Sequence, residues 1–82
     1  MKVVFTKSAE RQWEKLSVSV KKQMREKLVF YFSQSNPLSY ARKMRGRINE
    51  YRFRIGDWRV ICIKEKHTIN IAEIGRRDSI YK

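Results

Sequence analysis

The sequence of 82 residues holds one cysteine, one histidine and no run of about 18 apolar residues. Cys62 alone cannot form an internal disulfide, and with His67 as the only histidine a zinc site is not expected. The missing apolar run and the lack of a signal-peptide pattern argue against a membrane span and against export. These absences predict a single cytoplasmic domain, residues 1–82, with no cofactor and no membrane partner.

Acidic residues are also few. Eight Asp and Glu stand against twenty Lys and Arg, which gives a formal net charge of +12. Because a small domain bears such self-repulsion more easily beside a polyanion, nucleic acid or a nucleoprotein surface is the first expected partner. An acidic protein, an anionic membrane and a charge that serves solubility alone are the alternatives.

The first half of the chain is predicted to form a strand and two helices. Lys2–Phe5 is short and β-branched, and Thr6 can cap a helix that follows it. A second helix is predicted over about residues 18–34, before Asn36-Pro37. The two helices form a hairpin whose apolar stripes pack on a sheet. The stripe residues are Ala9, Trp13 and Leu16 in the first helix, and Val20, Met24, Leu28 and Phe32 in the second.

The second half reads as a meander of three strands. The strand-like runs cover residues 51–55, 58–63 and 68–74, and Gly56-Asp57 supplies a two-residue turn. With the first strand they predict an α+β fold, in which the helix hairpin covers one face of a mainly antiparallel four-stranded sheet. Residues 38–49 are expected to connect helix and sheet, with room for one helical turn.

Arginines alternate with apolar residues in the stretch EYRFRIGDWRVIC, residues 50–62. A two-residue turn at Gly56-Asp57 places Arg54 opposite Arg59, and strand alternation places Arg52 on the same face. Like charges in opposed positions destabilise a sheet, so an anion such as a phosphate is expected to offset them. The alternative is an ordinary solvated face on which the side chains splay apart.

Over nearly its whole length the sequence resembles the RelE/ParE toxin superfamily. The segments that carry the resemblance, by their order and spacing, are FTKSAERQWEKL, the NP after the second helix, KMRG, YRFRIGDWRVIC and IGRRDSIY. The resemblance implies a two-helix hairpin followed by a sheet. It also implies a toxin that a cognate antitoxin holds inactive.

Within the superfamily, the resemblance favours the RelE branch, which contains ribosome-dependent endoribonucleases that cut mRNA in the A site. It places their functional positions on Arg52, Arg54, Arg59, Arg77 and Tyr81, of which the first two are often lysines in that branch. The ParE branch has the same scaffold, generally lacks this set and acts on DNA gyrase. An inactive RNA-binding relative is a further alternative.

In such a cleavage the RNA supplies its own nucleophile, the 2′-hydroxyl. Arg59 and Arg77 are expected at the scissile phosphate, because fork-shaped permanent cations suit its added negative charge. Arg52 and Arg54 are expected to hold and polarise the substrate. Tyr81 is the expected proton acceptor, because arginine is a poor base. Tyr81 could instead orient the 2′-hydroxyl, stack on a base or pack on the sheet.

The remaining basic residues around the hairpin are predicted to bind RNA. They are Lys43, Arg45, Arg47 and Arg76. Glu50 is a less favoured base, and His67 is expected in a polar turn away from the arginines. Trp13 and Trp58 fall on apolar stripes and are predicted to belong to the core. An antitoxin is expected to cover the arginines or to displace the C-terminal tail.

Overall fold

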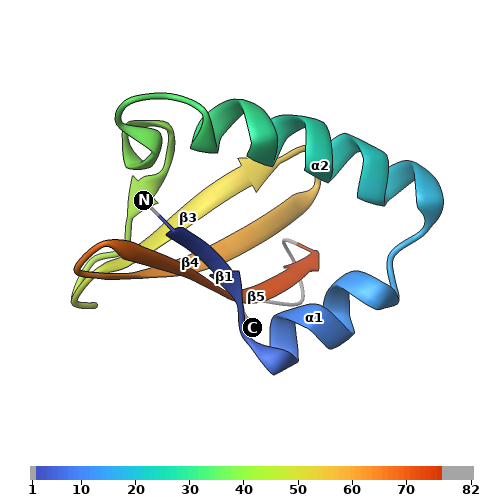
Figure 1. The fold of residues 1–82 in the computed structure, drawn as a ribbon. Helices are drawn as coiled ribbons and strands as arrows, with labels where there is room; N and C mark the ends of the chain where they lie inside the picture. The colour runs from blue at the N-terminus through green and yellow to red at the C-terminus, as the bar shows by residue number, and fades with distance from the viewer. Residues whose placement is uncertain (1, 77–82) are drawn as a thin grey trace.

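The computed structural model describes residues 2–76, which form a five-stranded sheet with two helices packed on it (Figure 1). In chain order the elements are β1 (Lys2–Phe5), α1 (Lys7–Glu14), α2 (Val18–Phe32), the 3₁₀ turn η1 (Pro37–Tyr40), β2 (Arg42–Lys43), β3 (Glu50–Ile55), β4 (Trp58–Glu65) and β5 (Thr68–Arg76). The strand order is β1-β5-β4-β3-β2, with β1 parallel to β5 and the other pairs antiparallel. The predicted α+β class and helix pair are confirmed.

The sheet has one strand more than predicted, because β2 lies in the segment that was expected only to connect helix and sheet. Arg42 pairs with Arg52, and Lys43 pairs with Tyr51 of β3. Two residues are too few to show a period of two, so alternation could not reveal this strand. The helical turn allowed for in the same segment is present as η1.

Helix α1 is fixed to the edge of the sheet by side-chain hydrogen bonds. Thr6 caps it as predicted, because its Oγ1 accepts from the N–H of Ala9 at 3.1 Å. β1 ends at Phe5, so β5 has no strand beside it further along that edge. There Gln12 takes the place of a strand, since its Oε1 accepts from the N–H of Ile74 at 2.7 Å.

Helix α2 begins at a second side-chain cap, the Oγ of Ser17, which accepts from the N–H of Val20 at 3.2 Å. It ends at Phe32, earlier than the predicted residue 34. The Ser33 hydroxyl donates to the carbonyl oxygen of Phe30 at 2.8 Å, a local bond that competes with continued helix. No helix in the described part of the chain is both long and apolar enough to cross a membrane.

The β3–β4 hairpin turns through Gly56-Asp57, as predicted, and pairs Ile55 with Trp58. Gly56 has φ 61°, in the left-handed region that favours glycine. A Cβ at this position would also lie 2.9 Å from Nε2 of Gln23 in α2. The glycine therefore fits the left-handed turn that sets the register of the hairpin, and the end of the Gln23 side chain lies against it.

A bulge in β5 changes which residues of that strand face the helices. The β4–β5 register shifts so that Ala72 is an extra residue. As a result Ile71 and Ile74, three positions apart, are both buried. The strand continues to Arg76, past the end predicted at residue 74.

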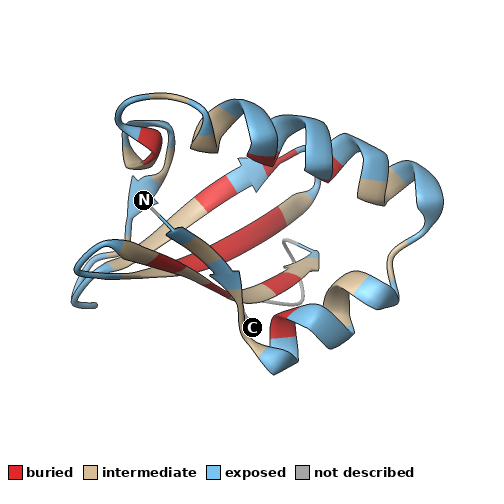
Figure 2. Cartoon of the chain, in the orientation of Figure 1, coloured by how far each residue is buried: buried red, intermediate tan, exposed pale blue. Residues whose placement is uncertain are grey.

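The core lies between the helices and the sheet (Figure 2). Buried and less buried positions alternate at the end of β3, whereas β4 has four consecutive buried residues from Arg59 to Cys62. Its buried residues are Ala9, Met24, Leu28, Phe53, Ile55, Val60, Cys62, Ile69, Ile71 and Ile74. Trp13 and Trp58 pack against this cluster, which confirms their prediction as core residues. The helices pack on one face of the sheet. The side chains that alternate with the core residues of β3 and β4 point to the opposite face.

Phe53 gives a direct test of this core. Its side chain is fully buried, with ring centroids 5.0 Å from Tyr31 and 5.5 Å from Phe32. We expect Phe53→Ala to lower the free energy of unfolding by about 3–5 kcal/mol in urea denaturation, because burial is lost and a cavity remains. The control Val18→Ala, at a side chain that is 85% exposed, should stay within about 0.5 kcal/mol. A loss below about 1 kcal/mol for Phe53→Ala would contradict the packing.

Candidate functional site

Arginines from three strands gather on the face of the sheet away from the helices. Arg54 pairs with Arg59 across β3 and β4, as predicted, and Arg52 pairs with Ile61. β2 adds Arg42, which pairs with Arg52 and so lies on the same face. We call Arg42, Arg52, Arg54 and Arg59 the arginine surface.

The members of this surface differ in burial. Arg42 and Arg54 are exposed, and Arg52 is half-buried. Arg59 is only 5% exposed, and its Nη1 donates to the carbonyl oxygen of Trp58 at 3.5 Å. The alternative of a wholly solvated face is therefore wrong at Arg59. Because the residue is buried, the field of its guanidinium is less screened by water than that of an exposed arginine.

Two carboxylates share the face with the arginines. Glu73 of β5 pairs with Ile61, so Arg52, Ile61 and Glu73 form one row across three strands. Glu50 precedes Arg52 by two positions in β3 and points to the same face. Its Oε1 lies 3.7 Å from Nη1 of Arg47. The face thus carries carboxylates as well as guanidinium groups.

Two of the predicted RNA-binding residues lie on the opposite, helix-covered face. Lys43 pairs with Tyr51, and its Nζ is 5.5 Å from the centroid of that ring. Arg76 pairs with Trp58, and its Cζ is 5.8 Å from the centroid of the Trp58 ring. Neither residue therefore belongs to the arginine surface, because β2 and the longer β5 set a register that the sequence pattern did not show. Their predicted binding of RNA stays a prediction.

The loop between β2 and β3 carries the other two predicted RNA-binding residues. Arg45 and Arg47 are exposed there, beside Gly46 with φ 69°. This loop precedes β3, so it lies at the end of that strand away from Arg54. His67 lies in the β4–β5 turn, at the far end of β4 from the arginine surface, as predicted.

Arg77 and Tyr81 lie outside the described residues, and their roles stay predictions from the sequence. Among residues 2–76 no three His, Cys, Asp or Glu side chains group as a metal site would require. Sequence reasoning missed Arg42 and Glu73 as members of this face. Arg42 lies on a strand too short to detect, and the bulge at Ala72 obscures the alternation that would place Glu73.

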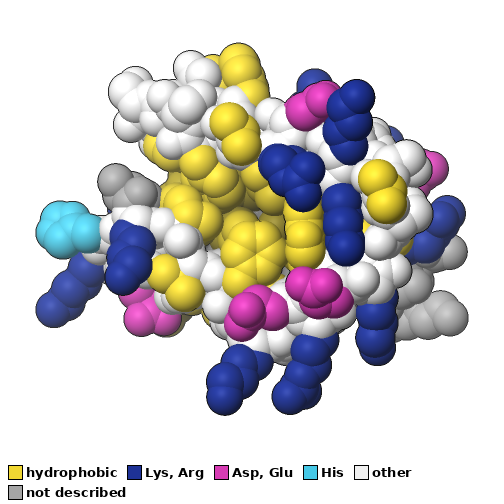
Figure 3. Space-filling view, turned by 45° about the vertical axis from the view of Figure 1, so that its right-hand side comes forward, with side chains coloured by type: hydrophobic (Ala, Val, Ile, Leu, Met, Phe, Trp, Pro, Cys, Tyr) yellow, Lys and Arg dark blue, Asp and Glu magenta, His cyan; other side chains and the backbone are white. Residues whose placement is uncertain are grey.

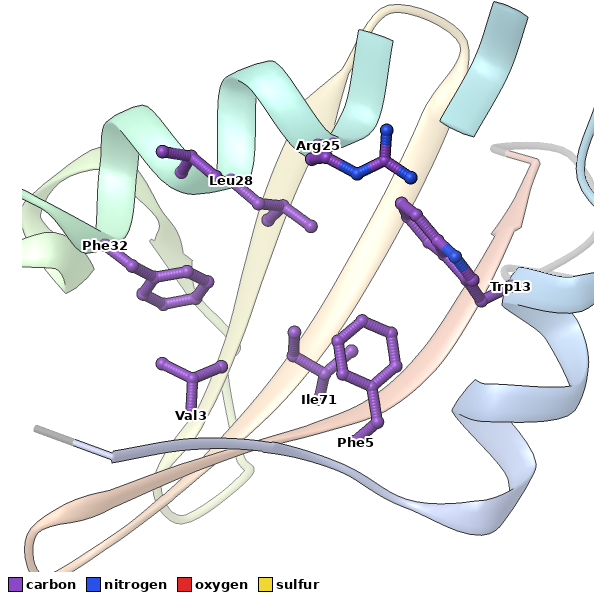
Figure 4. A pocket seen from close by; sticks show the side chains of 8 residues that line it. Val3, Phe5, Trp13, Arg25, Leu28, Phe32 and Ile71 are labelled. Atoms are coloured by element: carbon purple, nitrogen blue, oxygen red, sulfur yellow. The ribbon is translucent and has the colours of Figure 1, made fainter. Parts of the chain in front are cut away.

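An apolar groove of about 400 Å³ opens between the helices and β1 (Figure 3). Figure 4 shows Leu28 and Phe32 projecting from α2 toward Val3 of β1, with Trp13 of α1 at the far end. The Arg25 guanidinium lies over that tryptophan, with its Cζ 5.8 Å from the ring centroid. The groove therefore has a hydrophobic floor and a cation at its rim.

The single cysteine is not a nucleophile. Cys62 is fully buried, and burial raises the pKa of its thiol from 9.0 to about 12. At neutral pH the group is a protonated thiol with no access to a substrate.

The opposed pair Arg54 and Arg59 has an expected cost in stability. We expect Arg54→Gln to raise the free energy of unfolding by about 0.2–1 kcal/mol at low salt, because it removes one of two opposed like charges. The gain should shrink as salt screens the charges. Urea denaturation at two salt concentrations measures it, with Arg11→Gln on exposed α1 as control. A salt-independent loss of stability in Arg54→Gln would show that the pair does not repel.

Comparison with known proteins agrees with this architecture. A family model described as "ParE toxin of type II toxin-antitoxin system, parDE" matches residues 3–81. Comparison with curated protein sequences gives no match.

Several solved structures share the fold. A chain of the RelB–RelE antitoxin–toxin complex from Methanococcus jannaschii superposes with TM-score 0.77 at 23% identity, over 96% of this chain and 95% of that one. A chain of the intact E. coli RelBE complex gives 0.75 at 20% identity, over 92% and 94%. A YafQ variant from E. coli gives 0.62 at 9% identity, over 99% and 98%. The family match and the shared fold identify the chain as a member of the ParE toxin family of type II toxin–antitoxin systems, within the RelE/ParE superfamily.

Proposed function

We propose that this toxin is a metal-independent endoribonuclease that cleaves mRNA on the ribosome and so inhibits translation in the cytoplasm. The observation that carries the proposal is the arginine surface, in which Arg59 is almost fully buried and Arg54 lies directly opposite it. Guanidinium groups match phosphate oxygens in geometry and keep their charge at every physiological pH. A face built of them suits the binding of an RNA backbone.

The reaction needs no protein nucleophile. The 2′-oxygen of the RNA attacks the adjacent phosphorus as its proton passes to a base. The bond from phosphorus to the 5′-oxygen breaks, and the 5′-oxygen takes up a proton. The products are a 2′,3′-cyclic phosphate and a 5′-hydroxyl. The protein would contribute orientation of the backbone and stabilisation of the charge that develops on the phosphorane oxygens.

The described arginines are proposed to take three roles. Arg59, buried and held toward one face, would bind the oxygens of the phosphorane together with Arg77. Arg52 and Arg54, two positions apart on the neighbouring strand β3, would hold the substrate beside it. Arg42 extends the same surface by one strand and would contact a neighbouring phosphate. The ribosome would present the mRNA strand in the bent geometry that in-line attack requires.

The proton acceptor is proposed to be Tyr81, on the sequence argument alone. The carboxylates of Glu50 and Glu73 are the described groups on the same face that could accept the proton instead. Of these Glu73 lies in the row of Arg52, whereas Glu50 is close to Arg47. The exposed Arg45 and Arg47 would contact RNA backbone beside the site.

A cognate antitoxin is the proposed regulator. The related chains from E. coli and M. jannaschii were solved in complexes of RelE with RelB. The apolar groove beside Arg25 would accommodate apolar side chains of such a partner, with a carboxylate near the guanidinium. The strong positive charge of the toxin favours an acidic partner on the opposite face as well.

A second candidate function is inhibition of a topoisomerase without RNA cleavage. The match to the ParE family model favours it, whereas likeness to RelE at 20–24% identity shows the fold alone. The two functions differ in what the arginine surface must do. Only the nuclease requires Arg59 to stabilise a reacting phosphate.

Toeprinting of mRNA on programmed ribosomes distinguishes the two. We expect purified toxin to cut within the A-site codon, and Arg59→Ala to reduce the cleavage rate by about 10²–10³-fold, because one phosphorane donor is lost. Arg59→Lys should give an intermediate rate, since it keeps the charge without the fork. Arg77→Ala should also reduce cleavage.

The matched control is Arg11→Ala, at an exposed arginine of α1, which should cleave at the wild-type rate. Far-UV circular dichroism confirms that the Arg59 variants are folded. Intact mRNA with wild-type toxin, together with trapped gyrase–DNA complexes, would overturn the nuclease proposal in favour of the second candidate.

A further inference from the structure

A ladder of aromatic rings leads from the core to the surface near the end of α2. The Tyr31 ring stacks on Phe53 with centroids 5.0 Å apart and an interplanar angle of 18°. Tyr40 of η1 stacks on Tyr31 at 5.4 Å and 29°. Phe30 meets Tyr40 edge to face at 5.7 Å and 74°. The outer two rings, Phe30 and Tyr40, are called the aromatic platform.

The platform is exposed although its rings are held in place. Phe30 is 50% exposed and Tyr40 is 47% exposed, in contrast to the fully buried Phe53 at the base of the ladder. Rings supported from behind lose little side-chain freedom when a further ring stacks on them. The platform therefore presents flat aromatic surface at low entropic cost.

The platform is separate from the apolar groove. Val29 lines the groove, and Tyr31, two residues later, points to the other flank of α2, because each helical residue turns by about 100°. The platform residue Phe30 lies between them on the outer side of the helix. The platform and the groove are therefore two separate surfaces.

Cations lie around the platform and connect it to the arginine surface. Lys27 is exposed and one helical turn before Tyr31. Arg42, two residues after Tyr40, belongs to the arginine surface, so the chain passes directly from platform to arginines across the β2 edge. Glu26, one turn before Phe30, is the acidic neighbour on α2. Single-stranded RNA has flat bases and a charged backbone. It therefore matches an aromatic platform followed by the arginine surface better than an acidic peptide does.

We infer that Phe30 and Tyr40 stack on an unpaired base of single-stranded RNA whose backbone continues over β2 onto Arg42 and the arginine surface. This base-stacking subsite rests on the proposed function, because it binds the same RNA. The arginines would bind its phosphates, and the platform would bind a base. Base–aromatic stacking tolerates any base, so the subsite would add affinity without sequence preference.

The test uses two uncleavable probes with identical phosphates. One is a fluorescein-labelled 2′-O-methyl RNA dodecamer, and the other is the same strand with every base removed. Fluorescence anisotropy measures the Kd of wild-type toxin, Tyr40→Leu and Phe30→Leu for both. We expect each leucine variant to bind the base-containing strand about 5- to 100-fold more weakly, with an unchanged Kd for the abasic strand.

Two controls isolate the ring. Tyr40→Phe keeps the ring and should retain wild-type affinity, and Val18→Ala changes an exposed apolar residue outside the platform. Thermal unfolding verifies that each variant is folded. Equal losses on both strands, or no loss on either, would overturn the platform as a base-stacking subsite.

A third result that overturns the inference is weaker capture of the antitoxin by Tyr40→Leu with RNA affinity unchanged, which would make the platform a protein interface. The Kd values of Arg54→Ala for the two strands test the proposed function separately. If that variant leaves both affinities unchanged, the arginine surface does not bind RNA, whatever Tyr40 does.

Discussion

The position of Arg54 directly opposite Arg59 is the constraint on which the surface chemistry depends. The register that brings the two together is fixed from the other face of the same strands, where the pair Phe53 and Val60 is fully buried. A slip by one residue would expose those core side chains, so the hairpin cannot relieve the repulsion by sliding. The turn at Gly56 reinforces the same register. Core packing thus holds like charges together on the opposite face.

The two faces of the sheet have different compositions because only one of them receives the helices. The helix side carries the core, the apolar groove and the residues Lys43 and Arg76, whose cations lie over aromatic rings. The other side carries the arginine surface with Glu50 and Glu73. Association of α1 with the β5 edge through Gln12 allows the parallel strand β1 to stop short without leaving that edge bare.

Much of the fold follows from local patterns in the sequence. The stripe through Met24 and Leu28 predicted α2, and the alternation around Gly56 predicted the hairpin and the Arg54–Arg59 pair. The features of the fold that could not be predicted from the sequence are those set by the pairing register of strands far apart in the chain. The two-residue strand β2 and the bulge at Ala72 left Arg42 and Glu73 unassigned to the face. The burial of Arg59 could not be predicted either, because the alternation of residue types does not show which residues pack against a side chain.

The same limit applies to the aromatic platform. Phe30 and Tyr40 belong to different elements, and the 3₁₀ turn that brings Tyr40 against α2 has no strong sequence signal. The family match fixes the class of protein, whereas the choice between RNA and topoisomerase depends on how the arginines act. Membership and fold are compatible with both targets, so the chemistry of the surface must be measured.

The most direct measurement is an NMR titration that follows the Nε–Hε signals of the arginines while a 2′-O-methyl RNA dinucleotide, which cannot be cleaved, is added. The account expects saturable shifts of Arg52, Arg54 and Arg59, with Arg11 and Arg25 unchanged. Uniform shifts of all the arginines, or shifts confined to the helix side, would contradict a phosphate site on the arginine surface.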